Sequence, residues 1–294
     1  MMSNALLLTI KIGLNPNLFE VGGMEIAWHG VFTAVGVILG VGVAVWFGRR
    51  AGFPEDVIYN VALVLVIGGI IGARGLYVLE HLGKFRDDPL AVFNINAGGM
   101  SIYGSLIGGA IASWLYAFIR RMPNMSRAAD IAGMGAIVGM ATGRIGDIIN
   151  GEHFAKSTDL PWGVVYTHPN SPSFVRFGAD ALPQHPAVAY ELIGDLLIFA
   201  LLVLVYYRVK RAGITFFAFM FLYGLSRVFV SFLREDNIVF AGLRTAQIIA
   251  VAAMPIGLAG MIYLWRTPPQ EQRLTRAERR RQTREKGAEE RRTG

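Results

Sequence analysis

Long apolar segments dominate this sequence and decide what it can fold into. Seven follow one another, at residues 27–47, 57–79, 106–119, 131–142, 188–207, 214–233 and 246–264. A helix needs about 20 such residues to cross a bilayer, and the third and fourth segments reach this length only when extended over polar neighbours, to about Gly99 and Asn150. With 53% hydrophobic and 17% charged residues, the chain is predicted to be an all-α polytopic membrane protein with about seven transmembrane helices.

Basic residues in the connecting loops predict an orientation. Lys and Arg accumulate on the cytoplasmic side of a membrane. They are concentrated after the first, third, fifth and last segments, whereas the intervening loops are mixed or acidic. We therefore expect the N-terminus outside and the C-terminus in the cytoplasm.

Two stretches lie outside the predicted helices. Residues 151–187 contain five prolines and several aromatic residues, so we expect an irregular but packed extracytoplasmic cap. From residue 266 onward the chain carries ten basic and five acidic residues, whose mixed signs argue against nucleic-acid binding. The predicted organisation is a seven-helix transmembrane domain over residues 1–265, including the cap, and a basic cytoplasmic tail over 266–294, disordered or helical.

The chain contains no cysteine. Disulfides, thiolate metal sites and a thiol nucleophile on the protein itself are therefore excluded. Its five histidines show no His-Glu-x-x-His or comparable spacing. We predict neither a metal nor a cofactor.

The run at residues 143–152, GRIGDIINGE, places ionisable residues where a spanning helix should be apolar. Such residues are costly within a bilayer and usually have a function. Arg144 and Asp147 are three residues apart and share one helix face. The structural alternative is an intramembrane ion pair, which by itself says little about function.

With the predicted orientation, three arginines fall in the outer half of the membrane: Arg74, Arg144 and Arg227. A guanidinium binds phosphate through two parallel hydrogen bonds and stays protonated, so these residues predict an anionic phospholipid ligand. Five other polar residues also fall in the outer half: His29, Tyr103, His185, Tyr190 and Glu191. A continuous pore would need polar residues in both halves of the membrane.

At these residues the chain resembles the prolipoprotein diacylglyceryl transferases, a family of bacterial inner-membrane enzymes. The run at 143–152 is the most specific part of the resemblance. It is supported, in family order from about residue 20 to about residue 265, by Trp28-His29-Gly30, Gly72-x-Arg74, Gly98-Gly99-Met100-Ser101, Gly104-Ser105-Leu106-Ile107-Gly108, His185-Pro186 with Tyr190-Glu191, and Tyr223-Gly224 with Arg227.

The resemblance implies transfer of the sn-1,2-diacylglyceryl group from phosphatidylglycerol to the lipobox cysteine thiol of a preprolipoprotein. A thioether forms and glycerol phosphate leaves. The implied partners are phosphatidylglycerol, the preprolipoprotein signal peptide and the membrane. Since the reacting sulfur belongs to the substrate, an enzyme without cysteine is suited to this chemistry.

The resemblance also implies roles for individual residues. Arg144 and Arg227 are predicted to hold the phosphate and neutralise the leaving group, while His29 or Tyr103 assists thiol deprotonation. Imidazole titrates nearer neutrality than phenol, which favours His29. The residues predicted to bind phosphatidylglycerol are Arg144, Arg74, Asp147, Asn150, Glu152, Gly104, His185 and Tyr190.

The chain departs from the family pattern at several positions. His29 stands where tyrosine is common, Tyr103 where histidine is common, and Asp147 where asparagine is common; Ser231 and Val188 replace a usual glutamate and glutamine. These differences leave the identity of the base open. They also motivate one alternative, a lipid-binding relative without catalysis. A small-molecule transporter is the other, and the one-sided polar distribution argues against it.

Overall fold

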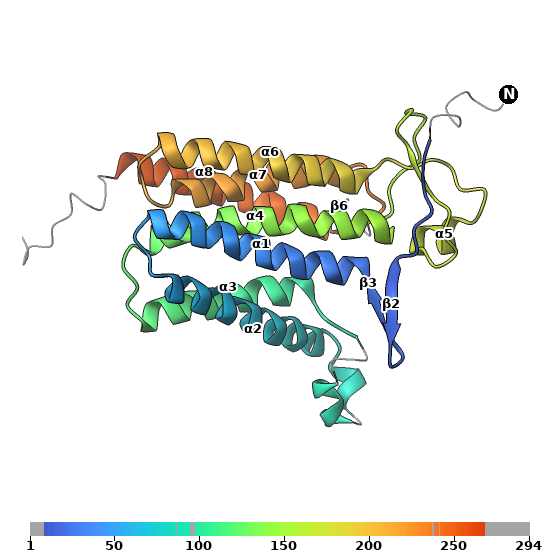
Figure 1. Ribbon diagram of the computed structural model, residues 1–294, viewed down its shortest axis with the longest axis horizontal. Helices are drawn as coiled ribbons and strands as arrows, with labels where there is room; N and C mark the ends of the chain where they lie inside the picture. Colours follow the sequence, from blue (N-terminus) through green and yellow to red (C-terminus); the bar gives the residue numbers. More distant parts are fainter. Residues whose placement is uncertain (1–8, 87, 95–97, 237, 241, 268–294) are drawn as a thin grey trace, which may run out of the picture.

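A computed structural model describes residues 9–86, 88–94, 98–236, 238–240 and 242–267. Its long helices run side by side in one bundle, and each covers all or nearly all of one predicted apolar segment (Figure 1). They are α1 (Trp28–Arg50), α2 (Glu55–Glu80), α3 (Ile102–Ile119), α4 (Met125–Asn150), α6 (Ala187–Arg208), α7 (Ile214–Ser231) and α8 (Thr245–Arg266). Of the predicted tail, all but residues 266 and 267 lies outside the described residues.

The chain is an all-α polytopic membrane protein. Within the described residues, six helices are long and apolar enough to cross a membrane, and these are all of the long helices except α4. That helix carries four charged residues along its length. It packs against α1, α6 and α7, and its Met134 and Ile137 are fully buried in the core. Neighbouring helices therefore separate much of α4 from lipid.

Glycines set the distance between α1 and α4. A Cβ added to Gly36 would lie 2.6 Å from the backbone oxygen of Gly139, and one added to Gly40 would lie 2.6 Å from that of Gly135. Only residues without side chains allow two helices to approach this closely. The small-residue repeats of the sequence therefore bring the polar end of α4 against the start of α1.

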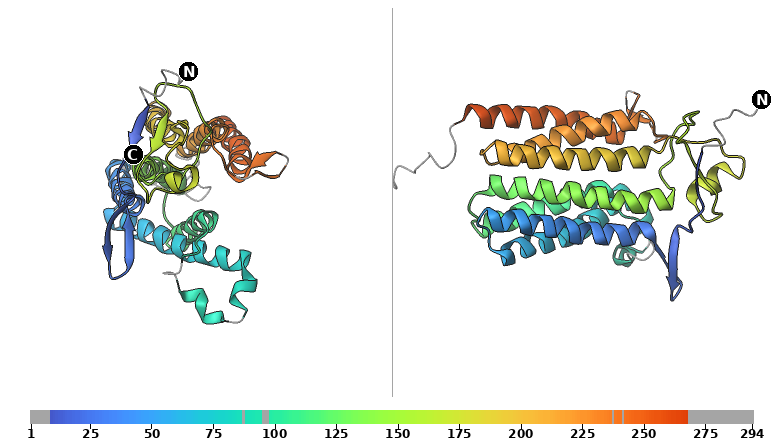
Figure 2. Two further views of the ribbon diagram at one scale, coloured as in Figure 1. Left: turned by 90° about the vertical axis from the view of Figure 1, so that its right-hand side faces the viewer. Right: turned by 45° about the horizontal axis from the view of Figure 1, so that its top comes forward.

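The helices group into pairs around α4. Figure 2 (left) looks along the bundle from one end: the α2–α3 pair lies on one side of α1 and α4, and the α7–α8 pair on another. At the far end, Asp130 of α4 accepts hydrogen bonds from the backbone N–H groups of Gly213 and Phe216, at 2.8 and 2.9 Å. A carboxylate at this position caps the first turn of α7.

Short strands and irregular segments gather at one end of the bundle (Figures 1 and 2). Residues 151–187 form a small cap there, which contains β4 (Val164–Tyr166) and α5 (Pro172–Phe177). The N-terminal strand β1 (Ile10–Ile12) pairs with β4 in parallel. The remaining elements at this end are the hairpin β2 (Asn17–Val21) and β3 (Met24–Ala27), the turns η2 (Leu82–Phe85) and η3 (Pro89–Phe93), and β5 (Ile238–Phe240) with β6 (Leu243–Arg244).

Candidate active site

A buried glutamate at the cap end of the bundle brings three arginines together. Glu191, the fifth residue of α6, is 4% exposed. Its carboxylate lies 3.0 Å from Arg144 of α4 and 3.4 Å from Arg234, just after α7, and it also accepts a hydrogen bond from Arg227 of α7. Three cations at low dielectric repel one another, and Glu191 supplies the shared counter-charge.

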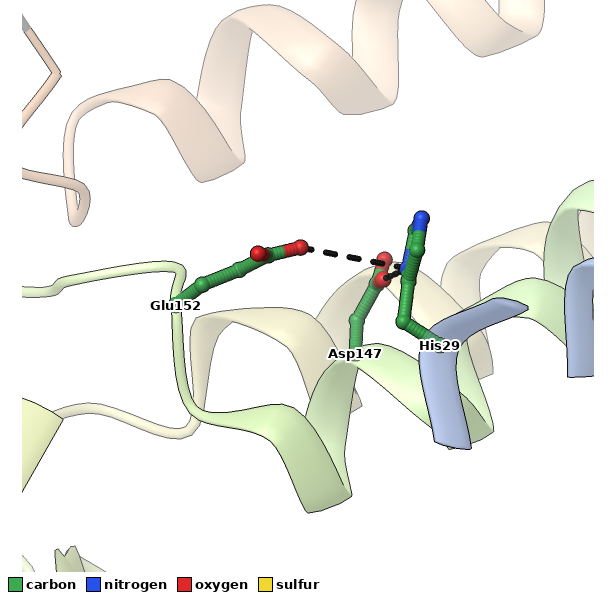
Figure 3. Close-up of side chains that lie close together, drawn as sticks. All are labelled: His29, Asp147 and Glu152. Atoms are coloured by element: carbon green, nitrogen blue, oxygen red, sulfur yellow. Dashed lines mark hydrogen bonds and ion pairs between the residues drawn. The ribbon is translucent and has the colours of Figure 1, made fainter. Parts of the chain in front are cut away.

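A second carboxylate, that of Asp147, joins the histidines to this cluster. Asp147 is 4% exposed and accepts a hydrogen bond from Nδ1 of His29 (Figure 3). Its other oxygen lies 3.1 Å from Arg144 and 3.3 Å from Nε2 of His153. Glu152, in the loop after α4, approaches His29 Nδ1 to 3.8 Å. Asp147 is thus held from three directions.

The two carboxylates belong to one closed network. Arg234 donates from Nη2 to Nδ1 of His153, at 2.9 Å. Because Nδ1 accepts, the ring proton of neutral His153 is on Nε2, where it faces Asp147. The contacts form a ring, from Asp147 to Arg144, Glu191, Arg234 and His153 and back to Asp147. Such a network orients its members before any ligand binds.

An open cleft lies beside this network. It has a volume of about 220 Å³ and includes Tyr103 from the start of α3, together with Arg227 and Arg234. Asp236, Thr245 and Ala246 complete its lining. Ligand pockets for drug-sized molecules are larger, at about 300–1,000 Å³, so this cleft suits a headgroup rather than a whole phospholipid.

The cap anchors the end of α4. Gly151 ends this helix in the left-handed region, with φ +71°, and a side chain there would meet Ser171 and the ring of Tyr166. The hydroxyl of Tyr166 donates to the backbone oxygen of Ile148 at 2.9 Å. Burial, with Asp147 nearby, raises the pKa of Tyr166 to about 12, so its hydroxyl stays protonated. The backbone oxygen of Asn150 accepts from Ser171 at 3.3 Å.

Arg74 does not join the arginine cluster, and its contact with the headgroup stays a prediction. Its five N–H groups donate to five backbone oxygens between α2 and α3, those of Ala91, Val92, Asn94, Gly98 and Gly99, at 2.7–3.1 Å. No donor of its guanidinium remains for a phosphate. The structure assigns Arg74 to holding this loop.

Gly104 likewise serves the contact between α2 and α3. A Cβ at this position would lie 2.3 Å from the backbone oxygen of Gly72. The residue is therefore needed for close helix packing. Its contact with phosphatidylglycerol stays a prediction.

His185 and Tyr190 lie where α6 meets the cap. The hydroxyl of Tyr190 accepts a hydrogen bond from Trp162 Nε1 at 2.7 Å. The rings of His185 and Tyr190 are 6.3 Å apart, and Nδ1 of His185 is buried without a hydrogen bond among the described residues. Their contact with lipid stays a prediction.

The sequence predictions missed three members of the network as site residues: Glu191, Arg234 and His153. Glu191 offered a signal, because it is a carboxylate near the start of an apolar segment. His153 and Arg234 offered little, since both lie in mixed polar loops. Only the packing of α4, α6 and α7 brings them together.

The fold and site define a polytopic helical membrane protein with a buried, arginine-rich polar site at one end of its bundle. The model of the prolipoprotein diacylglyceryl transferase family matches residues 16–263. The chain belongs to this family.

Several relatives carry the name phosphatidylglycerol--prolipoprotein diacylglyceryl transferase. The protein from Clostridioides difficile is 33% identical over 246 residues, which cover 84% of this chain and 94% of the relative. That from Trichormus variabilis is 32% identical over 260 residues, or 85% and 89% of the two chains. A third, from Synechocystis, is 30% identical over 261 residues, with coverage of 85% and 89%.

Proposed function

We propose that this chain transfers the sn-1,2-diacylglyceryl group from phosphatidylglycerol to the lipobox cysteine of preprolipoproteins, in the bacterial cytoplasmic (inner) membrane. Family membership supports this activity. The observation that carries it in the structure is the meeting of Arg144, Arg227 and Arg234 around Glu191 at one end of the bundle. The site end faces the outside in this proposal.

The reaction needs cations where the phosphate departs. The substrate sulfur attacks the glyceryl carbon that bears the phosphate ester, a C–S bond forms, and the C–O bond breaks with its electrons going to glycerol phosphate. Arg227 and Arg234 line the cleft. Nε of Arg144 is buried and makes no hydrogen bond to any described residue, so it keeps a donor for an anion. Donors fixed before the reaction stabilise charge that develops during it.

His29 is placed to accept the thiol proton. Its Nδ1 donates to Asp147, which leaves Nε2 as the acceptor, and Figure 3 shows this second nitrogen pointing away from both carboxylates. The side chain is 46% exposed, so a substrate thiol can approach it. A carboxylate that orients an imidazole in this manner is a recurrent arrangement for activating nucleophiles. Tyr103 is the second candidate, because it lines the cleft with Arg227.

The remaining predicted binding residues surround these groups. Asn150 and Glu152 flank the end of α4, and His185 and Tyr190 flank the start of α6. We place phosphatidylglycerol with its headgroup between these two helix ends. Holding lipid and peptide at one depth would lower the entropic part of the barrier.

The test is direct transfer to a peptide. Purified protein in vesicles that contain phosphatidylglycerol is incubated with a lipobox peptide, and the peptide mass is measured. We expect an increase equal to one diacylglyceryl group, absent when the peptide cysteine is replaced by serine. A peptide of unchanged mass, with vesicles and protein intact, would overturn the proposal.

A further inference from the structure

We propose that His29, Asp147 and Glu152 form a binding site for a divalent transition-metal ion such as Zn²⁺. Nδ1 of His29 and one carboxylate oxygen from each acidic residue lie within 4.8 Å of one another (Figure 3). Zinc binds such atoms at about 2.0–2.2 Å, which places tetrahedral ligands about 3.3–3.5 Å apart. The separation of 3.8 Å between His29 Nδ1 and Glu152 Oε1 is close to this value.

The three ligands combine one fixed group with two that can adjust. Asp147 is buried and held by Arg144 and His153. The side chains of His29 and Glu152 are 46% and 39% exposed. An ion can therefore reach the site from the aqueous end of the bundle. To admit the ion, His29 must turn away from Asp147, because the two side chains share a hydrogen bond.

The donor set and the charges suit a metal of this class. One imidazole nitrogen and two carboxylate oxygens are ligands that Zn²⁺, Co²⁺ and Mn²⁺ accept. The two carboxylates neutralise a divalent ion, while Glu191 stays the shared counter-charge of Arg144, Arg227 and Arg234. Three protein ligands leave a position for water, as in catalytic zinc sites.

His153 orients the site without being a ligand. Its Nε2 lies 3.3 Å from Asp147 and 3.9 Å from Glu152. Its Nδ1 accepts a hydrogen bond from Arg234, so the proton on Nε2 is directed at Asp147 and no lone pair is available there. Hydrogen bonds of this kind hold ligating carboxylates in place.

The sequence prediction of no metal depended on spacing within one helix. The ligands come instead from the first turn of α1, the last turn of α4 and the loop after α4. His29 and Asp147 are 118 residues apart. A short sequence motif therefore cannot reveal such a pair.

Binding of an ion would remove His29 from the role proposed above. The Nδ1 lone pair that binds a metal cannot coexist with the Nδ1 proton that is donated to Asp147. The ion would therefore inhibit diacylglyceryl transfer. This consequence depends on the proposed function, whereas the binding of the ion does not.

The experiment measures binding first. Full-length protein, purified in detergent through a tag without histidine and freed of metal by chelation, is titrated with Zn²⁺ by calorimetry and with Co²⁺ by visible absorption. We expect one ion per chain. His29→Gln and Glu152→Gln should each weaken binding by at least roughly 10–100-fold, the range seen even for groups that only orient ligands.

The matched control is His81→Gln. This histidine directly follows α2, where its Nδ1 bonds to the backbone oxygen of Tyr77, and its loss should leave the affinity unchanged. The thermal unfolding of every variant is measured, and Glu152→Gln decides the result if His29→Gln does not fold. No binding by the wild-type chain, or equal binding by both ligand variants, would overturn the site.

A second measurement tests the inhibition separately. Saturating Zn²⁺ should lower transfer to the lipobox peptide at least roughly tenfold, and a chelator should restore it. If Zn²⁺ binds and turnover is undiminished, the proposed inhibition is wrong but the metal site is supported. Absence of transfer in metal-free protein would instead count against the proposed function.

Discussion

At the scale of single residues, Glu191 determines how the arginines of the site lie. Its carboxylate contacts Arg144, Arg227 and Arg234, which come from α4, from α7 and from the segment after α7. Removing one partner of a buried ion pair leaves an uncompensated charge, which strongly destabilises the folded protein. Glu191 therefore contributes to folding and to the shape of the phosphate site together.

We predict that Glu191→Gln lowers both stability and transfer. Glutamine keeps the shape but removes the charge that the three guanidiniums share. The free energy of unfolding should fall by about 3 kcal/mol, the cost of breaking a buried pair, and peptide modification should fall at least roughly 100-fold. Denaturation in detergent and the peptide mass assay measure the two effects.

Glu235→Gln is the control for this change. Glu235 makes an exposed ion pair with Arg176 at 3.4 Å, and exposed pairs contribute about 0–1 kcal/mol. Its loss should leave both readouts nearly unchanged. Wild-type turnover in Glu191→Gln would contradict the role of the arginine arrangement in transfer.

A second prediction separates the two candidate bases. His29→Ala should lower the transfer rate by roughly 100–10,000-fold, the usual contribution of a general base, and the residual rate should rise with pH as the thiol ionises unaided. Tyr103→Phe should retain activity within about tenfold. The rates are measured across pH 6–9 at saturating phosphatidylglycerol. Full activity in His29→Ala, with a loss in Tyr103→Phe, would transfer the role to the phenol.

At the scale of elements, the α2–α3 hairpin is built by glycines and by Arg74. Gly72 and Gly104 bring the two helices into backbone contact, and Arg74 binds the loop that joins them with all five N–H groups. An arginine inside a helix pair costs little when backbone oxygens satisfy it completely. The hairpin thereby positions Tyr103 at the cleft.

We predict that Gly104→Ala destabilises this hairpin. The added methyl would lie 2.3 Å from the backbone oxygen of Gly72, so the helices must separate. Overpacking of this kind costs about 1–3 kcal/mol. Gly75→Ala on α2 is the control, because no other atom lies within 4 Å of its added Cβ, and alanine is favoured in a helix by about 0.5–1 kcal/mol. Equal unfolding midpoints for the two variants would contradict the close contact.

At the scale of the whole molecule, the cap and the irregular segments lie at one end of the bundle (Figure 1). The polar network joins the helix ends that meet the cap. The other end is closed by backbone caps such as Asp130 on α7. A bilayer forces this separation, because backbone groups without partners are tolerated only near water or inside protein. The described polar site therefore lies at the cap end of the bundle.

The chain without cysteines permits a direct test of its orientation. Val175→Cys places a thiol on α5 of the cap, and Arg208→Cys places one at the opposite end of α6; both native side chains are exposed. A membrane-impermeant maleimide should label the cap thiol in intact cells. The α6 thiol should react only after permeabilisation. The reverse pattern would show that the cap faces the cytoplasm.

The positions of the helices followed from the sequence, because the length and polarity of a bilayer span are local properties. The pairing of Arg144 with Asp147 followed for the same reason, since both lie on one helix face. The hydrogen-bond partners of Arg74 did not follow from the sequence, because they are loop oxygens that only the folded hairpin supplies.

The sequence by itself determined a bundle of apolar helices with arginines at one end and no thiol of its own. Only the tertiary structure decided which carboxylates serve those arginines and that Asp147 meets His29, 118 residues away. The physical reason is that hydrophobicity and helix periodicity act over neighbouring residues, whereas a charged network depends on distances between helices. Those distances are set by glycine contacts and by burial across the whole bundle.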